Sequence, residues 1–222
     1  GVGAGAGAEN GSNWYTRYVY KHLLNSEYFH SARDERSKRY MEYLGVKAIN
    51  TGCVTMWMFT PEFCKTIPTE KSDKVVFTLT AGYGVATEHD QCMIDILLRN
   101  YEQVYFFPQC VGDFEYLHKF KNIGRIKILE ASKAAYDEFL TNNYTDYVGT
   151  RLHGGVYAMR HARRAIIIAI DERARAINAN NNLNCVERNN IAELEQMINS
   201  DFETKIVMDF DSIKRWKSQF IF

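Results

Sequence analysis

From Lys74 to the C-terminus, short apolar segments alternate with longer segments of helical periodicity, and this alternation constrains the fold more than any other sequence feature. The apolar segments are rich in β-branched and aromatic residues, whereas the longer segments repeat their apolar residues every three or four positions. This pattern is typical of βαβ units, in which helices join parallel strands. We therefore predict a doubly wound parallel sheet over residues 74–222, ending in a terminal helix.

The predicted strands cover 74–80, 103–109, 125–131, 146–148 and 165–170, with helices between them at 88–101, 134–140 and 154–163. The last of these strands, with four isoleucines, does not alternate with polar residues. Such a run is typical of a central strand that is covered on both faces. The fold class that follows is α/β, with a Rossmann-type C-terminal domain.

The first 59 residues predict a smaller α/β unit that is separate from the larger domain. Strands are expected at 29–34 and 47–52, with a helix at 35–45 that Asp34 caps and Gly45 ends. Residues 60–73 contain two prolines and many polar side chains, so we predict a linker there. Because the chain opens with glycine rather than methionine, we expect a fragment or a trimmed chain.

Charge and cysteine content exclude several classes of function and location. The chain has 27 Lys and Arg against 27 Asp and Glu, so its net charge gives no electrostatic basis for binding nucleic acid. Its five cysteines are an odd number without Cys-x-x-Cys spacing, which favours free thiols in the cytoplasm. No apolar run approaches the roughly 20 residues of a transmembrane helix. We also expect no metal, because no His or Cys cluster has ligand spacing.

The segment Arg151-Leu152-His153-Gly154-Gly155 lies where a predicted strand leads into a helix. Ligands of open parallel sheets bind at the carboxyl ends of strands, and a helix N-terminus there favours an anion. Arg151 adds a planar donor set suited to phosphate or carboxylate, and His153 can transfer a proton near neutral pH. The two glycines would leave room for close approach of a ligand.

A purely structural interpretation of this segment also stays open. Arg151 could pair with a structural carboxylate, and His153 could be a satisfied core or capping histidine. Two weaker candidates are expected at the same sheet edge. Gly82 and Tyr83 follow the strand at 74–80 and would line the cleft, although no complete G-x-G-x-x-G motif is present. Glu172 follows the Ile-rich strand and could contact a sugar or nucleotide, next to Asp171 as a helix cap.

In the smaller unit, Arg33 repeats the pattern of an arginine at the end of a predicted strand. Its setting suggests a second ligand for an anion. A surface ion pair is the alternative, and the sequence does not separate the two.

Three segments resemble the polysaccharide pyruvyl transferase family: SARDERS at 31–37, the motifs within 44–53, and GTRLHGGVYAMRHARRAIIIAIDERA at 149–174. The resemblance extends from about Tyr28 to the C-terminus. It implies a GT-B-like fold, in which two Rossmann-type domains face each other across a cleft. Most of the N-terminal domain of that family would be missing from this chain, which leaves the activity of the chain alone open.

The resemblance implies that the chain transfers a pyruvyl unit from phosphoenolpyruvate to two hydroxyls of a sugar, forming a ketal and releasing phosphate. It implies that His153 is the general acid and that Arg33 and Arg151 bind the donor, phosphoenolpyruvate. Substrate contacts are expected at Leu152, Gly154, Gly155, Gly82, Tyr83 and Glu172. The acceptor would be a cell-envelope polysaccharide or a precursor that can be lipid-linked, which would bring the protein to the inner membrane face. No cofactor is expected beyond the donor substrate.

Two other functions stay open on the sequence. A GT-B glycosyltransferase would place the diphosphate of a nucleotide sugar on Arg151 and the helix N-terminus, so preference for a nucleotide sugar over phosphoenolpyruvate would identify it. A non-catalytic remnant that binds anions or glycans would show no turnover that depends on His153.

Overall fold

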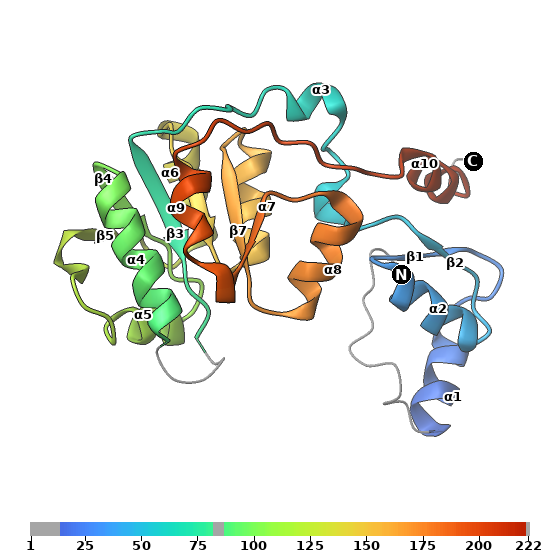
Figure 1. The fold of residues 1–222 in the computed structure, drawn as a ribbon. Helices are drawn as coiled ribbons and strands as arrows, with labels where there is room; N and C mark the ends of the chain where they lie inside the picture. Colours follow the sequence, from blue (N-terminus) through green and yellow to red (C-terminus); the bar gives the residue numbers. More distant parts are fainter. Residues whose placement is uncertain (1–13, 82–86, 221–222) are drawn as a thin grey trace. The chain divides into compact units, whose positions relative to one another are not determined.

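The computed structural model describes residues 14–81 and 87–220 (Figure 1). The chain divides into two compact units, of which unit 1 comprises Gly1–Thr60 with Val207–Phe222 and unit 2 comprises Pro61–Ile206. This division differs from the predicted boundaries at two places. The terminal helix belongs to the smaller unit, and the segment predicted as a linker belongs to the larger one.

Unit 2 contains a parallel sheet of six strands in the order β5-β4-β3-β6-β7-β8. The strands are β3 (Lys74–Thr78), β4 (Gln103–Phe106), β5 (Ile126–Ile128), β6 (Asp146–Gly149), β7 (Ala165–Ala169) and β8 (Cys185–Glu187). Each strand pair is parallel, which confirms the predicted doubly wound α/β fold. The strand order reverses its direction of growth between β3 and β6, as in Rossmann-type sheets.

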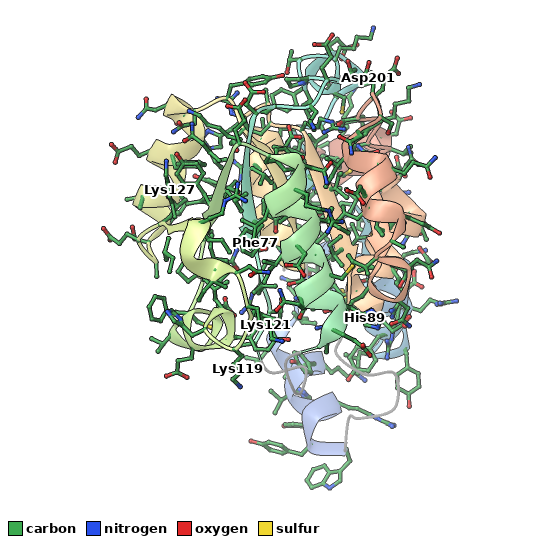
Figure 2. All side chains as sticks on the ribbon, turned by 60° about the vertical axis from the view of Figure 1, so that its left-hand side comes forward. Phe77, His89, Lys119, Lys121, Lys127 and Asp201 are labelled. Atoms are coloured by element: carbon green, nitrogen blue, oxygen red, sulfur yellow. The ribbon has the colours of Figure 1, made fainter. Side chains whose placement is uncertain are left out.

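The helices of unit 2 are α3 (Pro61–Cys64), α4 (Glu88–Asn100), α5 (Val111–Leu117), α6 (Lys133–Asn142), α7 (Leu152–Arg160), α8 (Glu172–Asn181) and α9 (Glu193–Ile198), with 3-10 turns η2 (Ile123–Arg125) and η3 (Arg188–Asn190). Helices α4 and α9 pack together on one face of the sheet, and α6 and α7 cover the other (Figure 1). Figure 2 shows Phe77 of β3 behind α4, with His89 and Asp201 marking opposite ends of this layer.

The core of unit 2 lies between the sheet and the helices that cover it. Phe77 of β3 is fully buried and pairs in register with Phe106 and Val148 of the neighbouring strands. From α4, Met93 and Leu97 pack into the same cluster. All five residues of β7 are buried, as the uninterrupted isoleucine run predicted.

Two local features of unit 2 differ from what local sequence alone indicates. The segment at 61–73 is not an open linker, since it contains α3 and buries Cys64 and Ile67. The basic segment after α7 is not simply the solvated end of a helix, because Arg164 is only 1% exposed. Its guanidinium binds Asp146, so a buried carboxylate from the start of β6 decides its position.

Unit 1 contains two short parallel strands, β1 (His30–Ala32) and β2 (Ala48–Asn50). Its helices are α1 (Trp14–Leu23), α2 (Glu35–Tyr43) and α10 (Phe210–Ser218), with the 3-10 turn η1 (Val54–Met56). As predicted, Asp34 caps α2 by accepting from the backbone N–H of Ser37, and Gly45 follows the helix with a positive φ of 78°.

The terminal helix α10 belongs to unit 1 because its side chains hydrogen-bond the backbone before β1. The indole N–H of Trp216 donates to the carbonyl oxygen of Phe29 at 2.8 Å, and Gln219 bonds both backbone groups of Phe29. These contacts are about 190 residues apart in sequence, so local patterns could not indicate them. Helix α1 was not predicted at all.

Within the described residues, the structure has no helix long and apolar enough to span a bilayer.

Candidate functional site

The candidate site lies at the carboxyl edge of the six-stranded sheet, where strands β3 and β6 end side by side. The connection that follows β3 leads to β4 on one side of β3 in the sheet. The connection that follows β6 leads through α7 to β7, in the opposite direction along the sheet. The two connections diverge, and in doubly wound folds ligands bind at such a point. Arg151 and His153 lie at this point, as the sequence predicted.

The backbone of Arg151 is fixed by a closed ring of hydrogen bonds with Thr78 and Tyr147, both fully buried. The Arg151 N–H donates to Thr78 Oγ1 at 3.2 Å, and the Tyr147 hydroxyl donates to the Arg151 carbonyl oxygen at 2.7 Å. The two hydroxyls are 2.6 Å apart. Since the Tyr147 proton is already used, Thr78 donates to Tyr147. Burial raises the pKa of the Tyr147 hydroxyl, which keeps it a donor.

The side chain of Arg151 is also held in place. Its Nε donates to the carbonyl oxygen of Leu79 at 3.2 Å, and its Nη2 donates to the carboxylate of Asp113. The side chain is 27% exposed, and among the described residues no hydrogen bond donated by Nη1 is seen. A fixed and partly exposed guanidinium is suited to binding a phosphate or carboxylate.

Helix α7 begins directly after Arg151, which is its N-cap residue with an extended backbone and no side-chain capping bond. The N–H groups of a first helical turn lack partners within the helix, and together with the helix dipole they favour an anion. His153 is the second residue of α7 and its side chain is exposed. The structure therefore brings together a fixed cation, a helix N-terminus and an exposed imidazole.

The other residues of the motif have packing functions. Leu152 is 2% exposed and belongs to the core, so it offers little surface to a substrate. Gly154 and Gly155 are also buried. A Cβ on Gly155 would overlap Ile167 and come within 2.7 Å of the Tyr147 ring. Gly155 thus allows α7 to pack closely on the sheet, while contact of these two glycines with a bound ligand stays a prediction.

The remaining predicted residues lie in different settings. Gly82 and Tyr83 fall outside the described residues. Asp171 caps α8, as predicted, while the adjacent Glu172 side chain is 87% exposed and bonds Arg175 at 2.7 Å. Glu172 thus forms an ion pair on its own helix, and its contact with a substrate stays a prediction.

Arg33 directly follows β1 in unit 1, as expected from the sequence. Its Nε lies 3.4 Å from the carboxylate of Asp34, and both side chains are mostly buried. The interpretation of Arg33 as an anion ligand stays a prediction.

Three residues of this edge were missed by the sequence analysis. Asp113 is fully buried and bonds Arg151, Gln109 follows β4 with an exposed side chain, and the exposed thiol of Cys110 lies 3.7 Å from Arg151 Nη2. All three belong to the segment around α5, where the sequence predicted no helix. Over 14–81 and 87–220, no group of three or more His, Cys, Asp or Glu side chains could hold a metal ion.

Comparison with protein families gives one match that covers most of the chain. The family model for polysaccharide pyruvyl transferase matches residues 2–172, which include Arg33, Arg151 and His153. A search of curated proteins gives no match. The matched region takes in most of the sheet and the whole α7 segment, so the chain belongs to the polysaccharide pyruvyl transferase family.

Proposed function

We propose that this protein transfers a pyruvyl group from phosphoenolpyruvate to two hydroxyls of one sugar residue, and that Arg151 and His153 form the donor half of the site. The observation that carries the proposal is the fixed guanidinium of Arg151 next to the N-terminus of α7, at the point where β3 and β6 diverge. The family match supports pyruvyl transfer as the type of reaction.

Phosphoenolpyruvate carries a phosphate and a carboxylate, so its site needs more than one group that binds anions. In this proposal the Arg151 guanidinium and the first turn of α7 bind one of them. Arg33, which the family resemblance implies as a donor ligand, is the second cationic ligand of this proposal.

The proposed reaction adds two hydroxyls to one carbon. His153, as general acid, donates a proton to the methylene carbon of the donor while the first sugar hydroxyl bonds to the adjacent carbon. The second hydroxyl then bonds to the same carbon and phosphate leaves with the electron pair of the broken C–O bond. One hydroxyl proton replaces the proton that His153 gave, and the other leaves on phosphate. The product is a pyruvate ketal, and no separate cofactor takes part.

In the same proposal the acceptor is a sugar of a cell-envelope polysaccharide or of its precursor. Where the precursor is linked to a lipid, the protein would work in the cytoplasm at the inner face of the membrane.

The test is thermal unfolding and calorimetric titration with phosphoenolpyruvate, beside a panel of nucleotide sugars at matched ionic strength. Ligand at about 100 times its dissociation constant adds roughly 2.7 kcal/mol of stability, which is a rise of about 5–10 °C for a chain of this size. We expect a rise with phosphoenolpyruvate. Arg151→Ala should weaken binding about 10- to 100-fold, since a hydrogen bond to a charged group is lost.

The far end of α7 offers matched controls, because Arg160 and His161 lie there. Arg160→Ala and His161→Ala should leave the affinity for phosphoenolpyruvate unchanged. His153→Ala should also leave it nearly unchanged, while turnover with a sugar acceptor falls about 10²- to 10⁴-fold. A shift with nucleotide sugars alone would indicate a glycosyltransferase instead. Equal effects of the variants at both ends of α7 would refute the assignment.

A further inference from the structure

The carboxylate of Asp113 accepts hydrogen bonds from three different segments at the carboxyl edge of the sheet. Asp113 lies in the first turn of α5 and is fully buried. Its Oδ1 accepts from the backbone N–H of Ala81 at 3.1 Å and from Arg151 Nη2, and its Oδ2 accepts from the backbone N–H of Gln109 at 3.1 Å. A buried carboxylate is normally paired and hydrogen-bonded, and here every partner belongs to the candidate site.

The three partners follow three adjacent strands. Ala81 follows β3, Gln109 follows β4 and Arg151 follows β6, and these strands are neighbours in the order β4-β3-β6. One side chain therefore joins the three loops from which a ligand at this edge would be contacted. The Gln109 side chain is also placed here, since its Nε2 is 3.0 Å from the point where a Cβ on Gly154 would lie.

We propose that Asp113 is a positioning residue for the donor site: it orients the Arg151 guanidinium so that Nη1 stays available to an anion. The inference rests on the proposed function of Arg151. It goes beyond that function because Asp113 contacts the donor only through Arg151 and through the loops that it joins.

The charge of Asp113 and its positioning of Arg151 should change the affinity for an anion in opposite directions, so the proposal can be tested by the sign of the change. A carboxylate next to Arg151 repels a bound anion, so its neutralisation should tighten binding if charge were its only contribution. If Asp113 acts by fixing Arg151, its neutralisation should weaken binding, because the guanidinium then loses its orientation. The sign of the change separates the two.

The experiment is calorimetric titration of the full chain with phosphoenolpyruvate, and separately with inorganic phosphate. We compare wild type, Asp113→Asn, Arg151→Ala and the double variant. The matched control is Asp146→Asn, since Asp146 is also a buried carboxylate paired with an arginine but lies at the opposite end of β6. All variants are measured at a temperature at which circular dichroism shows them folded.

We expect Asp113→Asn to weaken binding of phosphoenolpyruvate at least tenfold and Asp146→Asn to leave it within twofold of wild type. In the Arg151→Ala background, Asp113→Asn should change the affinity by less than twofold, because the residue through which it acts is gone. Unchanged or tighter binding by Asp113→Asn overturns the proposal, and so does a full additional loss in the Arg151→Ala background.

A second variant covers the case in which Asp113→Asn does not fold. Arg151→Lys keeps the positive charge but lacks the planar fork that reaches both Leu79 and Asp113. We expect its affinity to fall close to that of Arg151→Ala. Binding equal to wild type would mean that charge alone matters, which also overturns the proposal.

A readout without ligand separates this inference from the proposed function. In ¹⁵N-arginine spectra, the Arg151 Nε–H signal, assigned by its loss in Arg151→Lys, should exchange slowly with water in wild type and at least tenfold faster in Asp113→Asn. Wild-type protein that binds neither probe would refute the donor site, while this exchange rate would still decide whether Asp113 holds Arg151. Equal rates in wild type and Asp113→Asn overturn the positioning inference alone.

Discussion

Removal of the Asp146 carboxylate should strongly destabilise unit 2, because it leaves a buried cation without its counter-charge. Arg164 is 1% exposed, and its Nη1 donates to Asp146 Oδ2 at 2.7 Å. The same oxygen accepts from the Tyr101 hydroxyl at 2.7 Å, and Oδ1 accepts from the backbone N–H of Ser72 at 3.3 Å. Asp146→Ala thus removes three hydrogen bonds, one of which is also the ion pair with Arg164.

The expected loss is about 3–5 kcal/mol of unfolding free energy, as for a buried ion pair broken on one side. Against the roughly 5–15 kcal/mol of a typical domain this is a large fraction. For a unit of this size it corresponds to a fall in Tm of about 6–20 °C. The other contacts of Arg164 do not compensate, because its Nη2 already donates to the carbonyl oxygens of Met197, Ile198 and Ser200.

The assay is urea unfolding followed by far-UV circular dichroism. Tryptophan fluorescence serves as an internal comparison, since Trp14, Trp57 and Trp216 all belong to unit 1. Arg164→Met and the double variant Asp146→Ala/Arg164→Met complete a cycle. The double variant should lose clearly less than the sum of the single losses, because it leaves no unpaired charge. A loss below about 1 kcal/mol for Asp146→Ala, or strict additivity in the cycle, would refute the reasoning.

Three further predictions concern packing, capping and thiol reactivity. Gly155→Ala should cost about 1–3 kcal/mol in urea unfolding through overlap with Ile167, whereas Gly124→Ala, with open space around it, should stay within about 0.5 kcal/mol; equal midpoints would contradict the packing account. Asp34→Ala should destabilise unit 1 by about 1 kcal/mol through loss of the α2 cap, and a tryptophan-fluorescence midpoint equal to that of wild type would be the contrary result. Burial raises the pKa of the Cys185 thiol to about 11, so iodoacetamide followed by mass spectrometry should modify the exposed Cys110 at pH 7.5 and leave Cys185 intact. Since this pKa lies above the unfolded value, the stabilising effect of Cys185 is complete below about pH 9 and is lost as the pH rises toward 11; rapid alkylation of Cys185 at neutral pH would contradict it.

Bound phosphoenolpyruvate should also slow the alkylation of Cys110 if the proposed donor site is correct. The thiol lies 3.7 Å from Arg151 Nη2, so an anion held by Arg151 would restrict access to it. The measurement is the rate of Cys110 modification with and without phosphoenolpyruvate at equal ionic strength. Equal protection by sodium chloride would contradict a specific site.

The strands of unit 2 could be located from the sequence because each is a short apolar run whose composition already favours a pleated, buried conformation. The isoleucines of β7 illustrate this, since burial on both faces allows no polar alternation. The caps at Asp34 and Asp171 could be predicted because an N-cap needs only a short acceptor side chain and the first turn of its own helix.

Helices α1 and α5 were not predicted from the sequence, and for α5 the structure gives a physical reason. Helix α5 contains the acidic residue Asp113 at a fully buried position. Sequence patterns treat such a residue as exposed, since an isolated carboxylate is costly to bury. Only the folded chain supplies the two N–H groups and the guanidinium that offset the desolvation cost of the buried carboxylate.

The sequence by itself determined the alternation of strands and helices, the parallel α/β fold and the placement of Arg151 and His153 at the end of a strand, because these depend on local periodicity and on the chemistry of neighbouring residues. Tertiary structure alone decided that α10 belongs to unit 1, that Arg164 is buried against Asp146 and that Asp113 joins three loops around Arg151. These features depend on contacts between residues far apart in sequence. The physical reason is that a buried charge or hydrogen-bond donor must be paired, and its partner is a group that packing places next to it. No local sequence pattern specifies that partner.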